Sequence, residues 1–158
     1  AWREPRIGAA AWAAYLRGAM TELQTALLEL IRRTSAEIPD DVHRALLAAG
    51  ANEQQGSIAA NAMQIIDQNI ALAKNKSQPI CQDTGSVLFY VDCPVGYDQI
   101  TFAEAAREAV RQATRKGYLR QNSVDSLTGK NDGTNVGPGA PALHFQQQRA
   151  PEINVRLL

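Results

Sequence analysis

A cysteine in a polar, turn-prone setting is the first feature of this sequence that could carry chemistry. It stands in the stretch KSQPICQDTGS, residues 76–86, where Cys81 is followed at once by Gln82 and Asp83. A cysteine with a structural role usually behaves as a small buried hydrophobe inside an apolar run. Here Pro79 stiffens the backbone before the thiol, and the residues after it predict a loop. The thiol is therefore expected beside an amide and a carboxylate.

Three kinds of chemistry could use the Cys81 thiol. A nucleophilic cysteine needs a positioned base, and the only histidines, His43 and His144, fall in no recognisable partner motif. A zinc site needs further ligands at characteristic spacing, but Cys93 lies well downstream and no CxxC or HxxxH accompanies it. An iron–sulfur cluster could take one thiolate here and its other ligands from distant sequence. The neighbouring polar groups favour this third chemistry, with a polar substrate held against the metal, although spacing alone leaves all three open.

A second polar stretch, GYLRQNSVDSLTGKNDGTNVGPGA, separates a predicted helix from a predicted strand. Long loops inside compact domains are uncommon and often functional, whereas the alternative is a flexible connector. Tyr118, Leu119 and Val124 give this loop apolar side chains with which to pack. Its LTGKN segment suggests a phosphate-binding loop, but that motif requires a glycine where this chain has Val124. The phosphate-loop interpretation is therefore rejected.

The first half of the chain has the periodicity of helices. Thr21 can cap a helix whose apolar residues recur at three–four spacing. Asp40 or Asp41 can cap a second helix, which Gly50 would stop. The segment 57–76 continues in helical period, and its apolar face is broad. The residues that share this face are Ile58, Ala62, Ile65, Ile66, Asn69, Ile70 and Ala73.

From residue 79 onward the sequence has the character of a mixed region. Residues 87–91, VLFYV, predict a buried strand, and the segments PALHF and INVRLL are candidate strands. Residues 101–116 predict the clearest helix of the chain, with Thr101 and Glu104 as a capping box and Gly117 as its stop. The predicted fold class is α+β: a helical N-terminal layer followed by a mixed α/β region with a few strands.

Charge and cysteine content limit the expected partners and location. The chain has 158 residues, in which 16 basic and 16 acidic side chains cancel. It therefore offers no electrostatic case for binding nucleic acid or an anionic membrane, and no apolar run is long enough to span a bilayer. Two cysteines are too few for a disulfide scaffold and point to a reducing compartment, so a cytoplasmic location is expected.

Residues 1–19 differ from the rest of the chain and hold both of its tryptophans. Met20 could be a natural start, so residues 1–19 are interpreted as an upstream extension or remnant and set aside from the fold. The alternative is an extra docking helix that uses Trp12, Tyr15 and Leu16.

Three motifs together carry a resemblance to a known family. QPICQDTG, followed by GYLRQNSVDSLTGKN and GPGAPALHF, resembles the N-terminal part of the class I, iron–sulfur-dependent fumarate hydratases and the related tartrate dehydratase α subunits. The likeness runs from about Met20 to the end of the chain. It implies that residues 20–158 are the N-terminal part of an iron–sulfur hydro-lyase domain.

The resemblance also implies roles for individual residues. Cys81 matches the first of three cysteines that hold a four-iron, four-sulfur cluster. Gln82 and Asp83 match residues that contact a dicarboxylate substrate, with Asp83 as a catalytic residue. Arg120 matches an arginine that pairs with a substrate carboxylate. The implied reaction is the reversible hydration of fumarate to malate, with the cluster as Lewis acid.

The chain departs from the family pattern because the family's KGGG-type segment and two further cluster cysteines would lie beyond Leu158. Cys93 does not replace them and is predicted to be structural or incidental. A fragment, or a subunit whose partner or second copy completes the site, is therefore expected. Tartrate and a methylated fumarate stay open as substrates. A truncated, non-catalytic interaction module is the alternative from another functional class.

Overall fold

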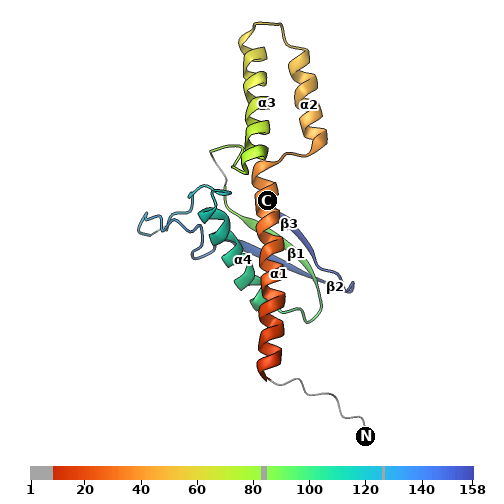
Figure 1. Ribbon diagram of the computed structural model, residues 1–158, viewed down its shortest axis with the longest axis vertical. Coiled ribbons are helices and arrows are strands. Elements are labelled where there is room, and N and C mark those ends of the chain that lie inside the picture. The colour runs from red at the N-terminus through yellow and green to blue at the C-terminus, as the bar shows by residue number, and fades with distance from the viewer. Residues whose placement is uncertain (1–8, 83–84, 126) are drawn as a thin grey trace.

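The computed structural model describes residues 9–82, 85–125 and 127–158, without the side chains of residues 9–17, 19 and 20. These residues form two regions (Figure 1): an α/β body, and a helical hairpin that extends beyond one end of it. The elements in chain order are α1 (Ala9–Ala36), α2 (Asp40–Ala51), α3 (Ile58–Lys76), β1 (Leu88–Pro94), α4 (Gln99–Arg115), β2 (Ala142–Gln148) and β3 (Asn154–Leu157). This architecture confirms the predicted α+β class.

The first helix is longer than the sequence pattern predicted. α1 runs without a break for 28 residues, so Thr21 lies inside the helix and the prediction that it caps the helix is wrong. The carbonyl of Thr21 accepts a bond from Thr25 Oγ1 at 2.9 Å. The helix continues upstream because residues 9–19 are rich in alanine, the strongest helix former. The side chains of Trp12, Tyr15 and Leu16 lie outside the described part of the structure.

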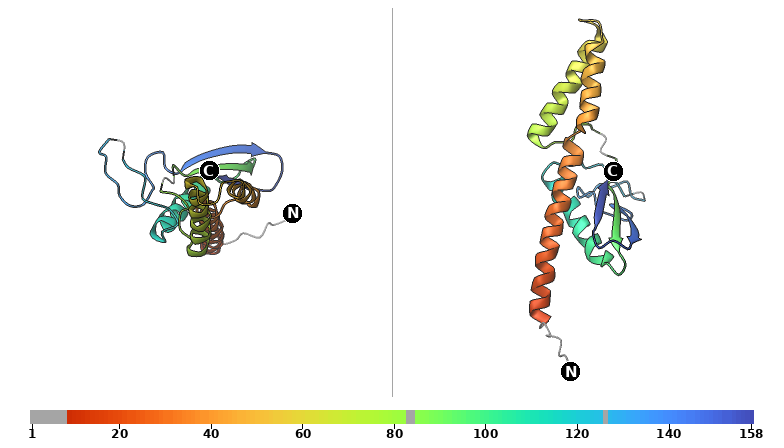
Figure 2. Two further views of the ribbon diagram at one scale, coloured as in Figure 1. Left: turned by 90° about the horizontal axis from the view of Figure 1, so that it is seen from above. Right: turned by 90° about the vertical axis from the view of Figure 1, so that its right-hand side faces the viewer.

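The described residues form a three-stranded mixed sheet in the order β2-β1-β3. β1 pairs in parallel with β2 through the α4 crossover and antiparallel with β3. Phe89, Val91 and Cys93 alternate toward the core and are at most 1% exposed. Both α1 and α4 cover this same face of the sheet (Figure 2). The burial of Cys93 confirms its predicted structural role, and β1 extends three residues past the predicted strand to include it.

α4 supplies most of the core that joins the sheet to α1. Small residues dominate its buried stripe, which lets α1 approach closely. Phe102 packs edge-on against Phe89 and Phe145, with ring centroids 6.4 and 5.6 Å away, while α1 contributes Leu27 and Ile31. The fully buried residues of α4 are Phe102, Ala105, Ala106, Ala109, Val110 and Ala113.

The start of α4 differs from the predicted capping box. Asp98 is the N-cap: its Oδ1 accepts from the backbone N–H groups of Ile100 and Thr101, both at 3.0 Å. Its Oδ2 accepts from Thr101 Oγ1 at 2.7 Å. The Thr101–Glu104 box is therefore wrong, because an equally strong capping residue stands one turn earlier. Gly117 ends the helix as predicted, with φ of 75°.

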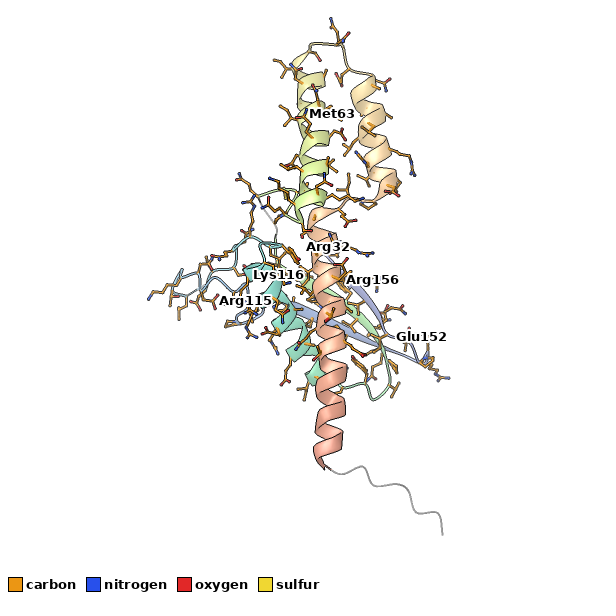
Figure 3. All side chains as sticks on the ribbon, in the orientation of Figure 1. Arg32, Met63, Arg115, Lys116, Glu152 and Arg156 are labelled. Carbon is orange, nitrogen blue, oxygen red and sulfur yellow. The ribbon has the colours of Figure 1, made fainter. Side chains whose placement is uncertain are left out.

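The hairpin of α2 and α3 buries little. Ser57 caps α3 by accepting from the backbone N–H of Ala60 at 3.0 Å. α2 starts at Asp40 after Pro39, without a side-chain cap, so the prediction of an aspartate cap is wrong. Gly50 does not stop α2, which ends at Ala51. A side chain at Gly50 would place its Cβ 3.3 Å from Met63 Cβ, so Gly50 lets α2 approach α3 (Figure 3 labels Met63).

Most of the predicted apolar face of α3 has no cover in the described part of the chain. Only Ile70 and Ala73, at the base of the hairpin, are buried. Ile58 is 90% exposed and Ile65 is 65% exposed. The face is uncovered because, among the described helices, α2 alone packs along α3, while α1 touches only its base. Within the described residues, no helix is long and apolar enough to cross a bilayer.

Candidate functional site

The loop that carries Cys81 is anchored by two helices. We call residues 79–82 the thiol loop. Ser77, the C-cap of α3, has a left-handed φ of 50° that turns the chain out of the helix. The N–H of Ile80 donates to the carbonyl of Ser35 in α1 at 3.0 Å, and Asn69 Nδ2 in α3 donates to the carbonyl of Ile80 at 2.7 Å. The thiol loop is thus held at Ile80, the residue before Cys81. Cys81 itself is exposed.

The second polar stretch meets the thiol loop. Arg120 Nε donates to the carbonyl of Cys81 at 3.4 Å. Asn122 Nδ2 donates to the carbonyl of Gln82 at 3.5 Å. Three of the four predicted site residues, Cys81, Gln82 and Arg120, therefore lie together although about forty positions separate the two stretches. Asp83 lies outside the described residues.

A cavity of about 390 Å³ opens beside the thiol loop. Cys81 forms part of its wall, and most of the other lining residues are apolar. An apolar wall lowers the local dielectric and strengthens any charge interaction at the rim. The lining residues come from the C-terminal end of α1 and the turn after it, the thiol loop, the residue before β1, the segment after α4 and the C-terminal end of β3. They include Ile31, Ile38, Ile80, Val87, Leu119 and Leu157.

The donor set at this cavity fits one ligand of a metal cluster. Cys81 is an exposed thiol at the cavity wall, whereas Cys93 is buried in β1. Among the described residues, no three His, Cys, Asp or Glu side chains are grouped closely enough to hold a metal. Cys81 can therefore serve as a single thiolate for a cluster whose other ligands come from elsewhere. Neither histidine lines the cavity: His43 bonds Asp67 in the hairpin at 2.7 Å, and His144 stacks on Tyr90 in the sheet.

Asn135 organises the stretch that contains Arg120, and the sequence prediction did not identify it. Its side chain makes four hydrogen bonds and the residue is only 5% exposed. Oδ1 accepts from the backbone N–H groups of Asn122 and Ser123, both at 3.0 Å. Nδ2 donates to the carbonyl of Arg120 at 2.6 Å and to Thr114 Oγ1 at 3.1 Å. One sequence signal could have identified it: Asn135 stands between two glycines, Gly133 and Gly137, in a turn-prone segment. Asparagine tolerates the left-handed φ of 56° that this residue adopts.

The remainder of this stretch is ordered by its own turns. The backbone N–H and hydroxyl of Thr128 bond Asp125 and lower the pKa of its carboxyl. The Thr134 hydroxyl and N–H do the same for Asp132. Leu119 packs into the core as predicted, but Val124 is 59% exposed and does not. The two aspartates thus stabilise turns, which favours a built loop over a flexible connector.

Comparison with known proteins identifies the family. The model of the family described as fumarate hydratase (fumerase) matches residues 24–158. A Geobacillus stearothermophilus protein named "Putative fumarate hydratase class I" is 44% identical over 139 residues, covering 88% of this chain and 27% of the relative. A Methanocaldococcus jannaschii protein named "Putative L(+)-tartrate dehydratase subunit alpha" is 27% identical, covering 87% of this chain and 49% of the relative. The L(+)-tartrate dehydratase subunit alpha of Escherichia coli K12 is 29% identical, covering 78% of this chain and 41% of the relative.

The names of these relatives define a class, that of hydratases and dehydratases of small acids. Within it, the chain belongs to the fumarate hydratase family, which confirms the resemblance seen in its motifs. The chain spans less than half the length of each of these three relatives.

Proposed function

We propose that this chain is the N-terminal segment of an iron–sulfur hydro-lyase that reversibly hydrates fumarate to malate. The observation that carries the proposal is the contact between Arg120 and the backbone of Cys81. It holds the Arg120 guanidinium, a group that can bind a carboxylate, against the loop whose Cys81 lines the cavity. The higher identity to the fumarate hydratase than to the tartrate dehydratase subunits supports fumarate as the substrate.

Cys81 would hold the cluster as one of its thiolate ligands. When bound, the cluster supplies a Lewis acid that polarises the substrate hydroxyl. The remaining ligands would come from further sequence or from a partner subunit, and two of the relatives are named as α subunits. We propose a homo-oligomer or a complex with such a partner, in the cytoplasm.

Arg120 would bind one carboxylate of the substrate. A guanidinium carries five N–H donors in a planar fork, and the bond to the Cys81 carbonyl uses only Nε. The Nη groups can form the two parallel bonds that a carboxylate accepts. Gln82 is exposed and follows Cys81 in the thiol loop, and its side-chain amide would contact the same substrate.

Asp83 would hold or move a proton during the addition of water. Its role rests on the motif CQDTG, in which the carboxyl directly follows the thiol loop. A competing role for this residue is to cap the turn before Gly85, as aspartate often does. The two roles differ in what they predict for turnover and for stability.

The test is turnover in the assembled enzyme that contains this chain, with fumarate, L-tartrate and a methylated fumarate as substrates. Asp83→Asn should lower kcat about a hundredfold or more, the scale of an acid–base group, with a near-normal melting temperature. Arg120→Lys should mainly raise KM, because an ammonium cannot form the planar fork. A parent rate for Asp83→Asn would contradict the proposal. So would a parent enzyme that neither hydrates fumarate or the methylated fumarate nor dehydrates L-tartrate.

Cys81→Ser and Cys93→Ser form a matched pair for the cluster. Cys81→Ser should lose the sulfur-to-iron absorbance and the activity, because a thiolate ligand is removed. Cys93→Ser should keep that absorbance per folded molecule and lose stability, because it places a hydroxyl in the core. Retention of the full cluster by Cys81→Ser would remove Cys81 from the metal site.

A further inference from the structure

Asn135 is one of two polar side chains in the described residues that are buried, the other being Thr114, to which it bonds. Burying an amide is costly unless its donors and acceptors are paired. All four bonds of Asn135 end within the stretch 114–123. Its burial therefore fixes that stretch.

Three of these bonds fix main-chain groups within the four residues 120–123. The side chain holds the carbonyl of Arg120 and the N–H groups of Asn122 and Ser123. The side chains of Arg120 and Asn122 in turn donate to the carbonyls of Cys81 and Gln82. One buried amide thus supports the two residues, Arg120 and Asn122, whose side chains donate these hydrogen bonds to the thiol loop.

The fourth bond ties this arrangement to the rigid body. Nδ2 of Asn135 donates to Thr114 Oγ1, and that hydroxyl donates to the carbonyl of Val110 in α4 at 2.8 Å. Val110 is fully buried in the core under α1. The backbone of Arg120 is therefore anchored, through Asn135 and Thr114, to the well-packed helix α4. It does not depend only on the exposed turns of its own loop.

We propose that Asn135 is a positioning residue: its side-chain amide sets where Arg120 and Asn122 meet the thiol loop and so sets the distance between the guanidinium and Cys81. Its effect on substrate rests on the proposed function, in which Arg120 binds a carboxylate. Its effect on the thiol loop does not.

The first test measures access to Cys81 in the full chain. Asn135→Asp keeps the shape and the acceptor but replaces the N–H donors with an oxygen facing the Arg120 carbonyl. Neutral iodoacetamide, applied at a pH where thiols are ionised, should then alkylate Cys81 about three- to tenfold faster, the scale of one or two lost hydrogen bonds. Asn135→Gly, which keeps the left-handed backbone and loses the amide, should act in the same direction.

Cys93 and Asn131 provide the controls. Cys93 is fully buried in β1, so it should be alkylated only when the core unfolds. Peptide mapping of both thiols therefore separates a loosened thiol loop, in which Cys81 alone reacts faster, from general unfolding, in which both do. Asn131→Asp removes a similar bond, from Nδ2 to the Gln121 carbonyl at 2.6 Å, but at an exposed side chain, and should change Cys81 access less than twofold. Equal acceleration of Cys81 and Cys93, equal effects of the Asn131 and Asn135 variants, or no acceleration of Cys81 would each overturn the proposal.

A mutant cycle tests the route of the effect. In a chain that already carries Arg120→Ala and Asn122→Ala, Asn135→Asp should add little to Cys81 alkylation, because residues that act in series are not additive. Full additivity would show that Asn135 acts on the thiol loop by another route and would overturn the proposal.

The second readout is the kinetic split in the assembled enzyme. Asn135→Asp should raise KM for fumarate about tenfold, on the scale of a misplaced charged hydrogen bond, with a smaller change in kcat. A purely structural role would lower kcat per total protein at constant KM and overturn the proposal. Faster Cys81 alkylation with unchanged kcat and KM would support the positioning role of Asn135. It would also show that Arg120 does not bind substrate, so that the proposed function fails while the positioning role stands.

Discussion

The α/β body and the α2–α3 hairpin differ greatly in how far they bury their residues. In the body, Phe89 and Phe102 are fully buried and α4 presents an unbroken stripe of buried residues. In the hairpin, none of the residues of α2 is buried, and α3 buries only Ile70 and Ala73. The two helices of the hairpin pack only against each other, so their outer faces stay exposed to solvent. In the body, two helices packed on a sheet enclose a core. The site lies where these regions join, with one anchor from each.

The largest test of this contrast is one substitution made in both regions. Ile31→Ala, at a fully buried position of α1, should lower the free energy of unfolding by about 2–5 kcal/mol, since it removes buried methylenes and leaves a cavity. Ile65→Ala, at a position 65% exposed in α3, should change it by less than about 0.5 kcal/mol. Urea unfolding measures both. Equal losses would mean that the face of α3 is covered in the folded protein.

Substitutions at the helix caps should have effects of intermediate size on stability. Ser57→Ala removes the side-chain acceptor at the start of α3 and should weaken that helix by about 1 kcal/mol. Because the hairpin has little core, hydrogen exchange should rise within residues 58–62 while the global melting temperature hardly moves. Asp98→Ala at the start of α4 should instead lower the global melting temperature, because α4 carries the core. A matching global loss for Ser57→Ala would show that body and hairpin unfold together.

The smallest effect concerns the joint between the two regions. Arg32 of α1, which Figure 3 labels, bonds Glu29 and Glu37. Its Nη1 also donates to the Ser77 hydroxyl at the end of α3, at 3.5 Å. Hydrogen bonds from Arg32 and Arg33 lower the pKa of Glu29 from 4.5 to about 2. The folded protein therefore binds fewer protons than the unfolded chain in this range. The stabilisation from Glu29 is complete above pH 4.5 and is lost as pH falls toward about 2.

The Glu29 effect is measured by melting temperature across that pH range. Glu29→Gln should flatten the acid slope, whereas Glu22→Gln, an exposed glutamate of the same helix outside this cluster, should not. Because the side chain of Glu29 is 45% exposed, solvent screening keeps the effect small, and added salt should reduce it further. An unchanged acid slope in Glu29→Gln would rule out this contribution.

Local rules predicted the elements better than their ends. The helical periods of residues 58–76 and 101–116 and the strand at 87–91 were recognisable because period and propensity agree there. The start of α1 was missed because Met20 and Thr21 resemble a beginning, although the alanine-rich residues before them propagate a helix. The cap of α4 was misplaced by one turn because Asp98, in a capping position, was overlooked. The mixed pairing of β1 with both neighbours depends on contacts between distant residues, which no local pattern encodes.

The candidate site divides in the same way. Cys81 stood out by its polar context, while the roles of Gln82, Asp83 and Arg120 came from family resemblance and stay proposals. The meeting of Arg120 with Cys81 could not be read from spacing, because it depends on how α4 and the thiol loop dock on α1. Asn135 was missed for a similar reason: its chemistry shows only when its four partners converge.

The position of α1 in the chain also has a consequence for synthesis. Its core residues Leu27 and Ile31 pack against α4, which is translated roughly 75 residues later, a delay of about 4–15 s at the usual rate of elongation. Among the described helices before α4, neither α2 nor α3 supplies an equivalent surface, since both extend away from the body. The apolar residues Leu27 and Ile31 of α1 therefore stay exposed on the nascent chain until α4 leaves the ribosome. A chain whose translation stops before α4 would be released with these residues still exposed.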